Sequence, residues 1–196
     1  VIRALGLYHA YCRAQGVDVC WLHTDNGTSF VSERTRAFVR EEIKARYTTT
    51  APYCPRANGE MERQWRSMGD DARRCMIGKR VPRNYAWYAL RHSVAVANTL
   101  PISSAPDSCA LSLFTGKKPN ASRFRVWGCV VYAKVYNRVT KMSDQAVRCI
   151  HLGLANDQTG YLCYEPESRK LITSVHCRFV ETATPGLTLN SEGGWQ

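Results

Sequence analysis

The sequence predicts an α/β fold followed by a small all-β part, and three observations lead to this. Apolar side chains recur at helical spacing in several stretches of the first hundred residues. One run, "VDVCWLHT" at 17–24, is short and apolar with two β-branched valines, as expected of a buried strand. From Arg125 onward the chain changes to short β runs separated by Asp, Asn, Gly and Ser, which is typical of a small barrel.

Two helices flank the predicted strand. The first covers residues 3–15, and the second follows the triplet Asp25-Asn26-Gly27. Ser32 is placed to cap the second helix, because its hydroxyl can accept a backbone N–H of the first turn. The apolar side chains that this helix should turn inward are Phe38, Val39 and Ile43.

Two further helices come after a proline-containing connection. The third begins at Asn58-Gly59 and carries one apolar stripe at helical spacing. The stripe consists of Met61, Trp65, Met68, Ala72 and Cys75. The fourth is the alanine-rich stretch at 85–98, which we expect to complete the core of the first half.

These elements divide the chain into four predicted parts. Residues 1–100 form the α/β part, and the turn-rich residues 101–124 connect it to the barrel. Residues 125–181 carry four β runs and form that barrel, whereas residues 182–196 are low in apolar content and are expected to be disordered. No stretch is long and apolar enough to predict a membrane span.

The charge of the chain favours an anionic partner. Formal net charge is +11, and basic residues exceed acidic ones in both halves, so the excess is not confined to a tail. A field of this sign attracts nucleic acid, where phosphate neutralisation dominates affinity. The alternative is an ordinary solvated surface without a specific partner.

The nine cysteines predict neither zinc nor disulfides. No C-x-x-C pair occurs, whereas zinc sites usually need closely spaced ligands. An odd number of cysteines in apolar surroundings is typical of reduced core side chains, so we expect no zinc in this segment.

Two carboxylates are candidates for chemistry. Asp25 ends the predicted strand, and Glu62 lies 37 positions later in the first turns of the third helix. Each has an ordinary explanation alone: Asp-Asn-Gly is a hairpin turn signal, and Glu62 can pair with Arg66 four residues on. Together, a strand-borne and a helix-borne carboxylate are what a two-metal site for phosphoryl transfer requires.

Three linked motifs resemble the integrase region of copia-type LTR retrotransposon Pol polyproteins. They are "HTDNGTSF" at 23–30, "TAPYCPRANGEMERQWRSM" at 50–68 and "LFTGKKPNASRFRVWGCVVYAKV" at 113–135. The resemblance extends to about Glu181. It implies a partial ribonuclease-H-like integrase core, followed by a retroviral-type SH3-like barrel at 125–181.

The resemblance also implies roles for individual residues. Asp25 and Glu62 would be the second and third members of a DDE triad that holds Mg²⁺ or Mn²⁺. The first Asp is expected upstream of the helix at 3–15, outside this sequence. Three departures from the family pattern are an Asp-to-Glu spacing one residue longer than the commonest form, a second carboxylate at Glu60, and "PRANG" at 55–59 in place of the more usual Gln-rich stretch. Residues assigned to DNA contact are Asn58, Arg63, Arg66, Arg73, Lys117, Lys118, Arg123 and Arg125.

The function implied is insertion of element cDNA into target DNA by 3′-end processing and strand transfer. The expected partners are the cDNA ends, the target duplex and further copies of the protein. The expected location is the nucleus, after assembly in a cytoplasmic particle. An alternative is a non-catalytic DNA-binding module, a decayed or domesticated remnant. A ribonuclease H or resolvase is disfavoured by the SH3-like half.

Overall fold

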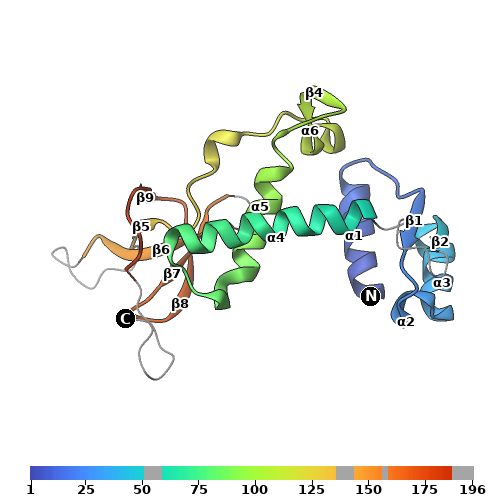
Figure 1. The fold of residues 1–196 in the computed structure, drawn as a ribbon, viewed down its shortest axis with the longest axis horizontal. Helices are drawn as coiled ribbons and strands as arrows, with labels where there is room; N and C mark the ends of the chain where they lie inside the picture. Colours follow the sequence, from blue (N-terminus) through green and yellow to red (C-terminus); the bar gives the residue numbers. More distant parts are fainter. Residues whose placement is uncertain (51–58, 136–143, 156–158, 187–196) are drawn as a thin grey trace. The chain divides into compact units, whose positions relative to one another are not determined.

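The computed structural model describes residues 1–50, 59–135, 144–155 and 159–186, and these form two compact units (Figure 1). Unit 1 comprises residues 1–65 and 101–118, and unit 2 comprises residues 66–100 and 119–196. Helix α4 (Gly59–Lys79) contributes to both units. The predicted disordered tail at 182–196 lies largely outside the described residues.

Unit 1 is built around two parallel strands. β1 (Trp21–Thr24) pairs with β2 (Arg46–Thr49), with Trp21 opposite Arg46 and Thr24 opposite Thr49. The other elements are α1 (Ile2–Ala14), α2 (Thr28–Val31), α3 (Glu33–Phe38), the π-helix η1 (Val39–Ile43), β3 (Pro101–Ile102), β4 (Ala105–Cys109) and α6 (Ala110–Thr115).

The predicted buried strand at 17–24 is only partly correct. Strand geometry begins at Trp21, whose side chain is 62% exposed, and Thr24 alone is buried. Within the described residues β1 is hydrogen-bonded to β2 alone. A strand with a single neighbour leaves one edge and parts of both faces exposed to solvent. The apolar sequence of β1 is therefore not enough to bury it.

The helical prediction after Gly27 is confirmed, although one expected helix is three short ones. The Ser32 side chain accepts the Thr35 N–H at 3.4 Å and caps α3, as predicted. Val39 and Ile43 are buried, whereas Phe38 is half-buried. A hairpin after Asp25-Asn26-Gly27 is therefore excluded.

Unit 2 contains a five-stranded antiparallel sheet in the order β8-β7-β6-β5-β9. The strands are β5 (Val130–Lys134), β6 (Ala146–Leu154), β7 (Tyr161–Glu165), β8 (Lys170–Ser174) and β9 (Cys177–Val180). The helical elements are the second half of α4, η3 (Arg83–Tyr85), α5 (Ala86–Ala97) and η4 (Ala121–Arg123). The four predicted β runs thus fold together, with the last one divided into β8 and β9.

The main core of unit 2 joins helices to the sheet. Trp127 is 2% exposed and donates its indole N–H to the Leu152 carbonyl at 3.1 Å. Ala72 of α4 and Ala89 of α5 are buried in the same cluster, together with Ile150. The helix at 85–98 was predicted correctly, but it packs against β6 in unit 2, whereas we expected it to complete the core of the first half.

Gly128, in the third sequence motif, lies where α4 approaches the sheet. Its φ is +75°, a region that favours glycine, and a Cβ there would lie 2.9 Å from side-chain atoms of Lys79 and Val81. Any larger residue would push the end of α4 away from β5.

Five cysteines are buried and reduced, as expected: Cys12, Cys109, Cys129, Cys149 and Cys163. Cys75 and Cys177 are reduced and half-buried, and Cys20 is exposed. Cys54 lies outside the described residues. Among the described helices, none has the length and apolarity to cross a membrane.

Candidate functional site

Asp25 lies directly after the carboxyl end of β1 and is exposed. Its Oδ1 accepts the backbone N–H of Gly27 at 3.2 Å, which closes a local Asx turn. The carboxylate is therefore presented at the surface of unit 1, where its remaining lone pairs can accept a ligand.

Hydrogen bonds to β2 and to α2 hold the loop that carries Asp25. The Asn26 side-chain amide donates to the Thr50 carbonyl at 2.7 Å, and the Thr50 N–H donates to the Thr24 carbonyl at 2.9 Å. The Tyr47 hydroxyl donates to the Phe30 carbonyl at 2.8 Å and lies 2.8 Å from the Thr24 hydroxyl. These bonds join the end of β1 to β2 and to α2, so the backbone that carries the Asp25 carboxylate is held in place.

Gly27 leaves room for that carboxylate. A Cβ at this position would lie 3.1 Å from Asp25 Oδ1 and 3.5 Å from the Phe30 ring. The first of these contacts is tighter than side chains usually tolerate, so a larger residue would displace the Asp25 carboxylate.

His23 is a neighbour that the sequence analysis missed. Its Nδ1 lies 2.9 Å from the Thr48 hydroxyl and its Nε2 lies 3.3 Å from the Thr50 hydroxyl. The available signal was its place in the sequence, two residues before Asp25. It is exposed and can act as a hydrogen-bond partner close to Asp25 in the chain.

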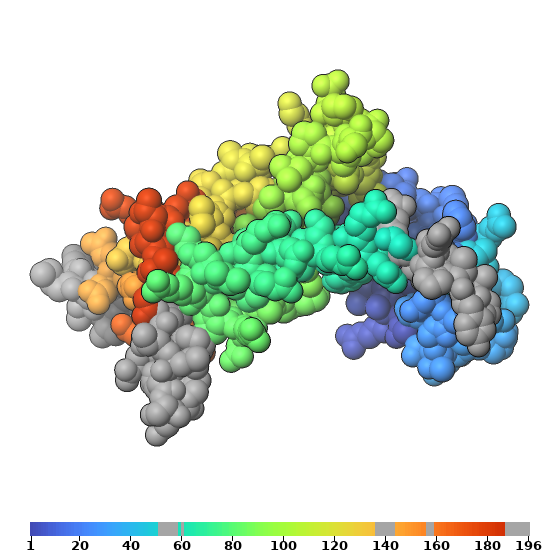
Figure 2. Space-filling view, in the orientation of Figure 1, coloured from blue at the N-terminus to red at the C-terminus, as the bar shows by residue number. Residues whose placement is uncertain are grey.

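Glu62 lies in the first turns of α4 and is exposed, as are all residues from 61 to 67. Figure 2 shows this helix, in teal and green, on the face of the molecule turned to the viewer. The predicted apolar stripe is therefore buried only in its second half: Met61 and Trp65 are 56% and 57% exposed, whereas Ala72 is 5% exposed. The first half of α4 is a surface helix, and the second half belongs to the core of unit 2.

The metal site stays a prediction. The carboxylate oxygens of Asp25 and Glu62 are ligands that Mg²⁺ prefers. The described residues contain no hydrogen bond that joins the two side chains, and no group of three His, Cys, Asp or Glu that could hold a metal. The donor chemistry of the two carboxylates fits Mg²⁺.

The predicted DNA-contacting residues on α4 differ in their surroundings. Arg63 and Arg66 are exposed, whereas Arg73 forms an ion pair with Asp70 at 2.5 Å. Exposed pairs of this kind contribute little stability, so a phosphate can replace Asp70 as the partner of Arg73 at small cost. Asn58 lies outside the described residues.

The second predicted basic group is divided between the units. Lys117 and Lys118 are exposed in unit 1, whereas Arg123 and Arg125 belong to unit 2. Arg125 donates to the carbonyls of Ser122 and Phe124 at 2.6 and 2.8 Å, and its guanidinium lies 5.6 Å from the Phe179 ring centroid. Arg125 thus supports the fold of unit 2, whatever else it binds.

Unit 1 has a basic cavity that sequence reasoning did not find. It has a volume of about 480 Å³ and is lined by Arg36, Arg40, Tyr47 and Thr49, among others. Arg40 also contacts Glu41 at 3.3 Å. The spacing of four residues between the two arginines was the available signal, since it places them on one side of a helix.

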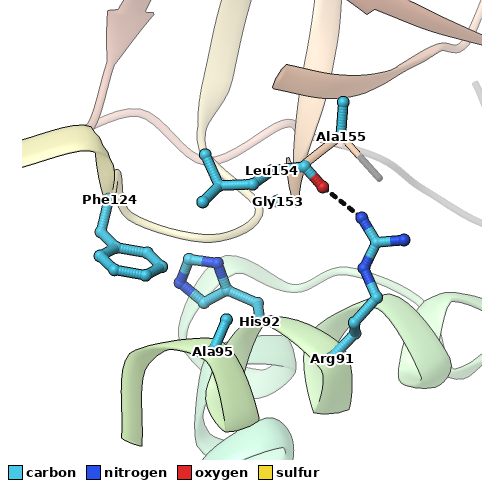
Figure 3. A pocket seen from close by; sticks show the side chains of 7 residues that line it. All are labelled: Arg91, His92, Ala95, Phe124, Gly153, Leu154 and Ala155. Carbon is cyan, nitrogen blue, oxygen red and sulfur yellow. Dashed lines mark hydrogen bonds between the residues drawn. The ribbon is translucent and has the colours of Figure 1, made fainter. Parts of the chain in front are cut away.

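Unit 2 has a smaller cavity of about 220 Å³ between α5 and β6 (Figure 3). Arg91 of α5 donates to the Leu154 carbonyl on one side, and His92 points toward Phe124 on the other. Burial lowers the pKa of His92 to about 4, and its Nδ1 has no partner among the described residues. This imidazole is neutral at pH 7.

Comparison with known protein families assigns part of unit 2 to a domain family. Residues 129–192 match the family described as the retroviral polymerase SH3-like domain, which agrees with the five-stranded sheet of unit 2. The expected SH3-like part is therefore confirmed.

The wider relationship is to retrotransposon polyproteins. The chain is 30% identical over 171 residues to the retrovirus-related Pol polyprotein from transposon RE2 of Arabidopsis thaliana, which covers 86% of this chain and 12% of that protein. It is also 30% identical over 165 residues to the RE1 polyprotein of the same plant, covering 83% of this chain and 11% of that protein. The TNT 1-94 polyprotein of Nicotiana tabacum is 25% identical over 184 residues, covering 93% and 14%.

The predicted resemblance to the integrase region of copia-type Pol polyproteins is confirmed by these relatives. The chain spans only 11% to 14% of their length. A chain of the simian T-cell lymphotropic virus intasome, solved in complex with the PP2A regulatory subunit B56 gamma, matches with 18% identity and a TM-score of 0.47, covering 91% of this chain and 63% of that one.

Proposed function

We propose that this chain is part of an integrase that inserts retrotransposon cDNA into target DNA by metal-dependent phosphoryl transfer. The observation that carries the proposal is Asp25, an exposed carboxylate fixed at the end of a strand within the Asp-Asn-Gly motif. The relationship to Pol polyproteins supports the same interpretation.

We further propose that unit 1 is part of a ribonuclease-H-like core. Two parallel strands joined by a helical connection, as β1 and β2 are, suit an α/β fold of this kind. Asp25 and Glu62 would then hold Mg²⁺ or Mn²⁺ together with an Asp from a strand that precedes residue 1 in the complete protein. When bound, the metal ions would activate the attacking 3′-hydroxyl and stabilise the leaving oxygen.

The other residues of the chain supply binding and orientation. Arg63, Arg66 and Arg73 extend along α4 from Glu62 and would hold phosphates of the cDNA end. Lys117, Lys118 and Arg123 would add phosphate contacts elsewhere on the chain. The complete protein would act as a homo-oligomer in the nucleus, so that two cDNA ends can be joined to one target duplex.

A second candidate is a DNA-binding remnant without catalysis. It needs only the basic surface. The absence of a group of three possible metal ligands among the described residues does not separate it from the integrase, whose third ligand is proposed to precede residue 1. Both candidates would bind DNA through the basic surface, but only the integrase would need the carboxylates of Asp25 and Glu62.

Strand transfer by a polypeptide that includes the upstream segment separates them. Asp25→Asn and Glu62→Gln should each abolish Mg²⁺-dependent joining of a cDNA end to target DNA while leaving duplex affinity unchanged. The matched controls are Asp18→Asn and Glu60→Gln, which remove a carboxylate close by in sequence and should keep activity. A wild-type protein that binds DNA and joins nothing would favour the remnant.

The proposed phosphate contacts have their own test. Duplex binding by this chain should weaken steeply as salt rises, because phosphate neutralisation releases counterions. Reversing both Arg66 and Arg73 to Glu should weaken binding and flatten the dependence of log K on log salt. If the slope of the double variant equals that of the wild type, the DNA does not follow α4.

A further inference from the structure

The outer face of the sheet in unit 2 carries a row of three side chains across neighbouring strands. Tyr132 lies at the centre of β5, with Arg148 of β6 opposite it on one side and Arg178 of β9 opposite it on the other. Residues paired in this way share a face of the sheet, with Cβ atoms about 4.5–5.5 Å apart. The tyrosine is therefore flanked by an arginine on each side.

This face is turned to solvent. Tyr132 is 40% exposed, whereas its neighbours Val131 and Ala133 are fully buried on the opposite face. Among the described residues, the cation–π contacts involve the rings of Trp21 and Phe179, so neither flanking guanidinium covers the ring of Tyr132. The aromatic face is thus open to a ligand.

A groove of about 730 Å³ borders two members of this row, Tyr132 and Arg178, and its size suits a small ligand or a few units of a polymer. Its lining includes Tyr132, Lys134, His176 and Arg178, and no carboxylate. Two exposed acidic residues adjoin the lining in the chain, Asp144 before Gln145 and Glu181 after Val180. The Glu181 carboxylate accepts the Val126 N–H at 3.2 Å. The groove is therefore suited to an anionic occupant.

Neither arginine is neutralised by a described carboxylate, and Arg148 is also held by the fold. Arg148 donates to the Pro185 carbonyl at 2.8 Å, which orients its guanidinium and leaves its charge uncompensated. No described carboxylate forms an ion pair with Arg148 or Arg178. Arg148 and Arg178 lie in register on either side of the exposed Tyr132 ring. This arrangement suits a nucleic acid strand, in which bases that can stack on a ring alternate with phosphates that can bind cations.

We infer that this face, defined by Tyr132, Arg148, Arg178 and Lys134, binds single-stranded nucleic acid, with a base stacked on Tyr132 and phosphates on the cations. Stacking on a side chain requires an unpaired base, because bases inside a duplex are already stacked on each other. An acidic peptide would use the cations and leave the ring without a partner. The inference rests on the proposed function only in taking the anion to be a nucleic acid, and it adds the form of that nucleic acid.

The test measures fluorescence anisotropy of labelled oligo(dT), oligo(rU) and a mixed-sequence duplex with the whole chain. Tyr132→Ala should weaken binding of the single strands by about 5- to 150-fold, the range for loss of one stacked base, and leave duplex affinity within about twofold. Tyr132→Phe keeps the ring and should bind as the wild type does. The preferred sugar is the one that the wild-type protein binds more tightly, oligo(dT) or oligo(rU).

Arg178→Ala should weaken single-strand binding and lower its salt slope by about one. Its control is Lys170→Ala, which removes an exposed cation from β8 in the same unit and should change neither quantity. Thermal unfolding of Tyr132→Ala should match that of Tyr132→Phe, which shows that the sheet is intact.

Three results would overturn the inference. They are unchanged single-strand affinity in Tyr132→Ala, an equal loss for duplex and single strands, and displacement of oligo(dT) by oligoglutamate at comparable concentration, which would assign the face to an acidic protein. Strand transfer is not measured in this experiment, so the face can fail the test while the proposed integrase function stands.

Discussion

At the scale of single residues, Tyr47 holds the base of the Asp25 loop. Its hydroxyl joins three elements, since it lies on β2, donates to the Phe30 carbonyl of α2 and contacts the Thr24 hydroxyl of β1. Both contacts are partly buried, so water replaces them poorly.

Tyr47→Phe should therefore loosen this loop. We expect about 1–3 kcal/mol less local stability, because the Phe30 carbonyl loses its hydroxyl donor. Amide hydrogen exchange at Thr50, whose N–H donates to Thr24, should become faster by the corresponding factor. Tyr11→Phe is the control: Tyr11 is 48% exposed and keeps its stacking on Phe114, so Thr50 exchange should not change. Equal rates in all three proteins would remove Tyr47 from this role.

Two buried histidines make unit 2 sensitive to acid. Burial lowers the pKa of His92 to about 4 and that of His151 to about 3 from the ordinary 6.5. The rings lie 6.1 Å apart, and His151 Nδ1 accepts the Gly153 N–H at 3.4 Å, which requires the unprotonated nitrogen. Both rings are neutral in the folded protein at pH 7.

Unfolding should become easier as pH falls below 6.5. In this range the unfolded chain binds protons that the folded chain does not, so the free energy of unfolding falls with decreasing pH, by up to about 1.4 kcal/mol per pH unit for each histidine. The stability is complete above pH 6.5 and is lost as pH falls toward the folded-state pKa values. Urea midpoints between pH 7 and 5.5 should show this slope before most carboxylates titrate. His92→Phe should reduce it, and an unchanged slope would show that His92 is not the group responsible.

At the scale of elements, the contact between α5 and β6 is made through a small side chain. Ala89 is fully buried in the cluster that contains Trp127 and Leu152, whereas Trp87, two residues earlier on the same helix, is 66% exposed. The alanine lets the helix backbone approach the sheet, and the exposed tryptophan contributes little to that packing.

Ala89→Met should therefore destabilise unit 2 by about 1–3 kcal/mol, since a well-packed core has no room for three more heavy atoms. Trp87→Met introduces the same side chain on the opposite side of α5 and should change stability by no more than about 0.5 kcal/mol. Chemical unfolding followed by near-ultraviolet circular dichroism measures both. Equal effects of the two substitutions would contradict the packing described for α5.

At the scale of the whole molecule, each compact unit combines two segments that are separate in the sequence. Unit 2 takes its helices from residues 66–100 and its sheet from residues 119–196. Its main core combines Ala72, Val81 and Ala89 from the earlier segment with Trp127, Ile150 and Leu152 from the later one. The sheet thus relies on helices that precede it by many residues.

A polypeptide of residues 66–196 should consequently fold and bury Trp127, whereas residues 119–196 alone should aggregate or bind hydrophobic dyes. The shorter piece exposes the faces of Trp127 and Leu152 that the two helices cover, and large apolar patches promote association. Tryptophan fluorescence and sedimentation compare the two. A monomeric, cooperatively folded 119–196 would favour the predicted boundary at residue 125.

Local sequence determined much of this protein. The helices at 3–15 and 85–98, the Ser32 cap and the β runs after Arg125 were predicted correctly, because spacing and capping act within a few residues. One motif glycine, Gly27, also has a local explanation, since it makes room for Asp25. The carboxylate at the strand end was visible for the same reason.

Tertiary structure decided which faces meet. An apolar stripe says that α4 has a side to bury, but not that Ala72 is covered while Trp65 remains exposed. The partner of α5 is β6, which lies more than fifty residues later, and the row of Arg148, Tyr132 and Arg178 exists only through strand register. Such long-range pairings depend on the packing of the whole unit, because no local pattern specifies the distant residues that complete them.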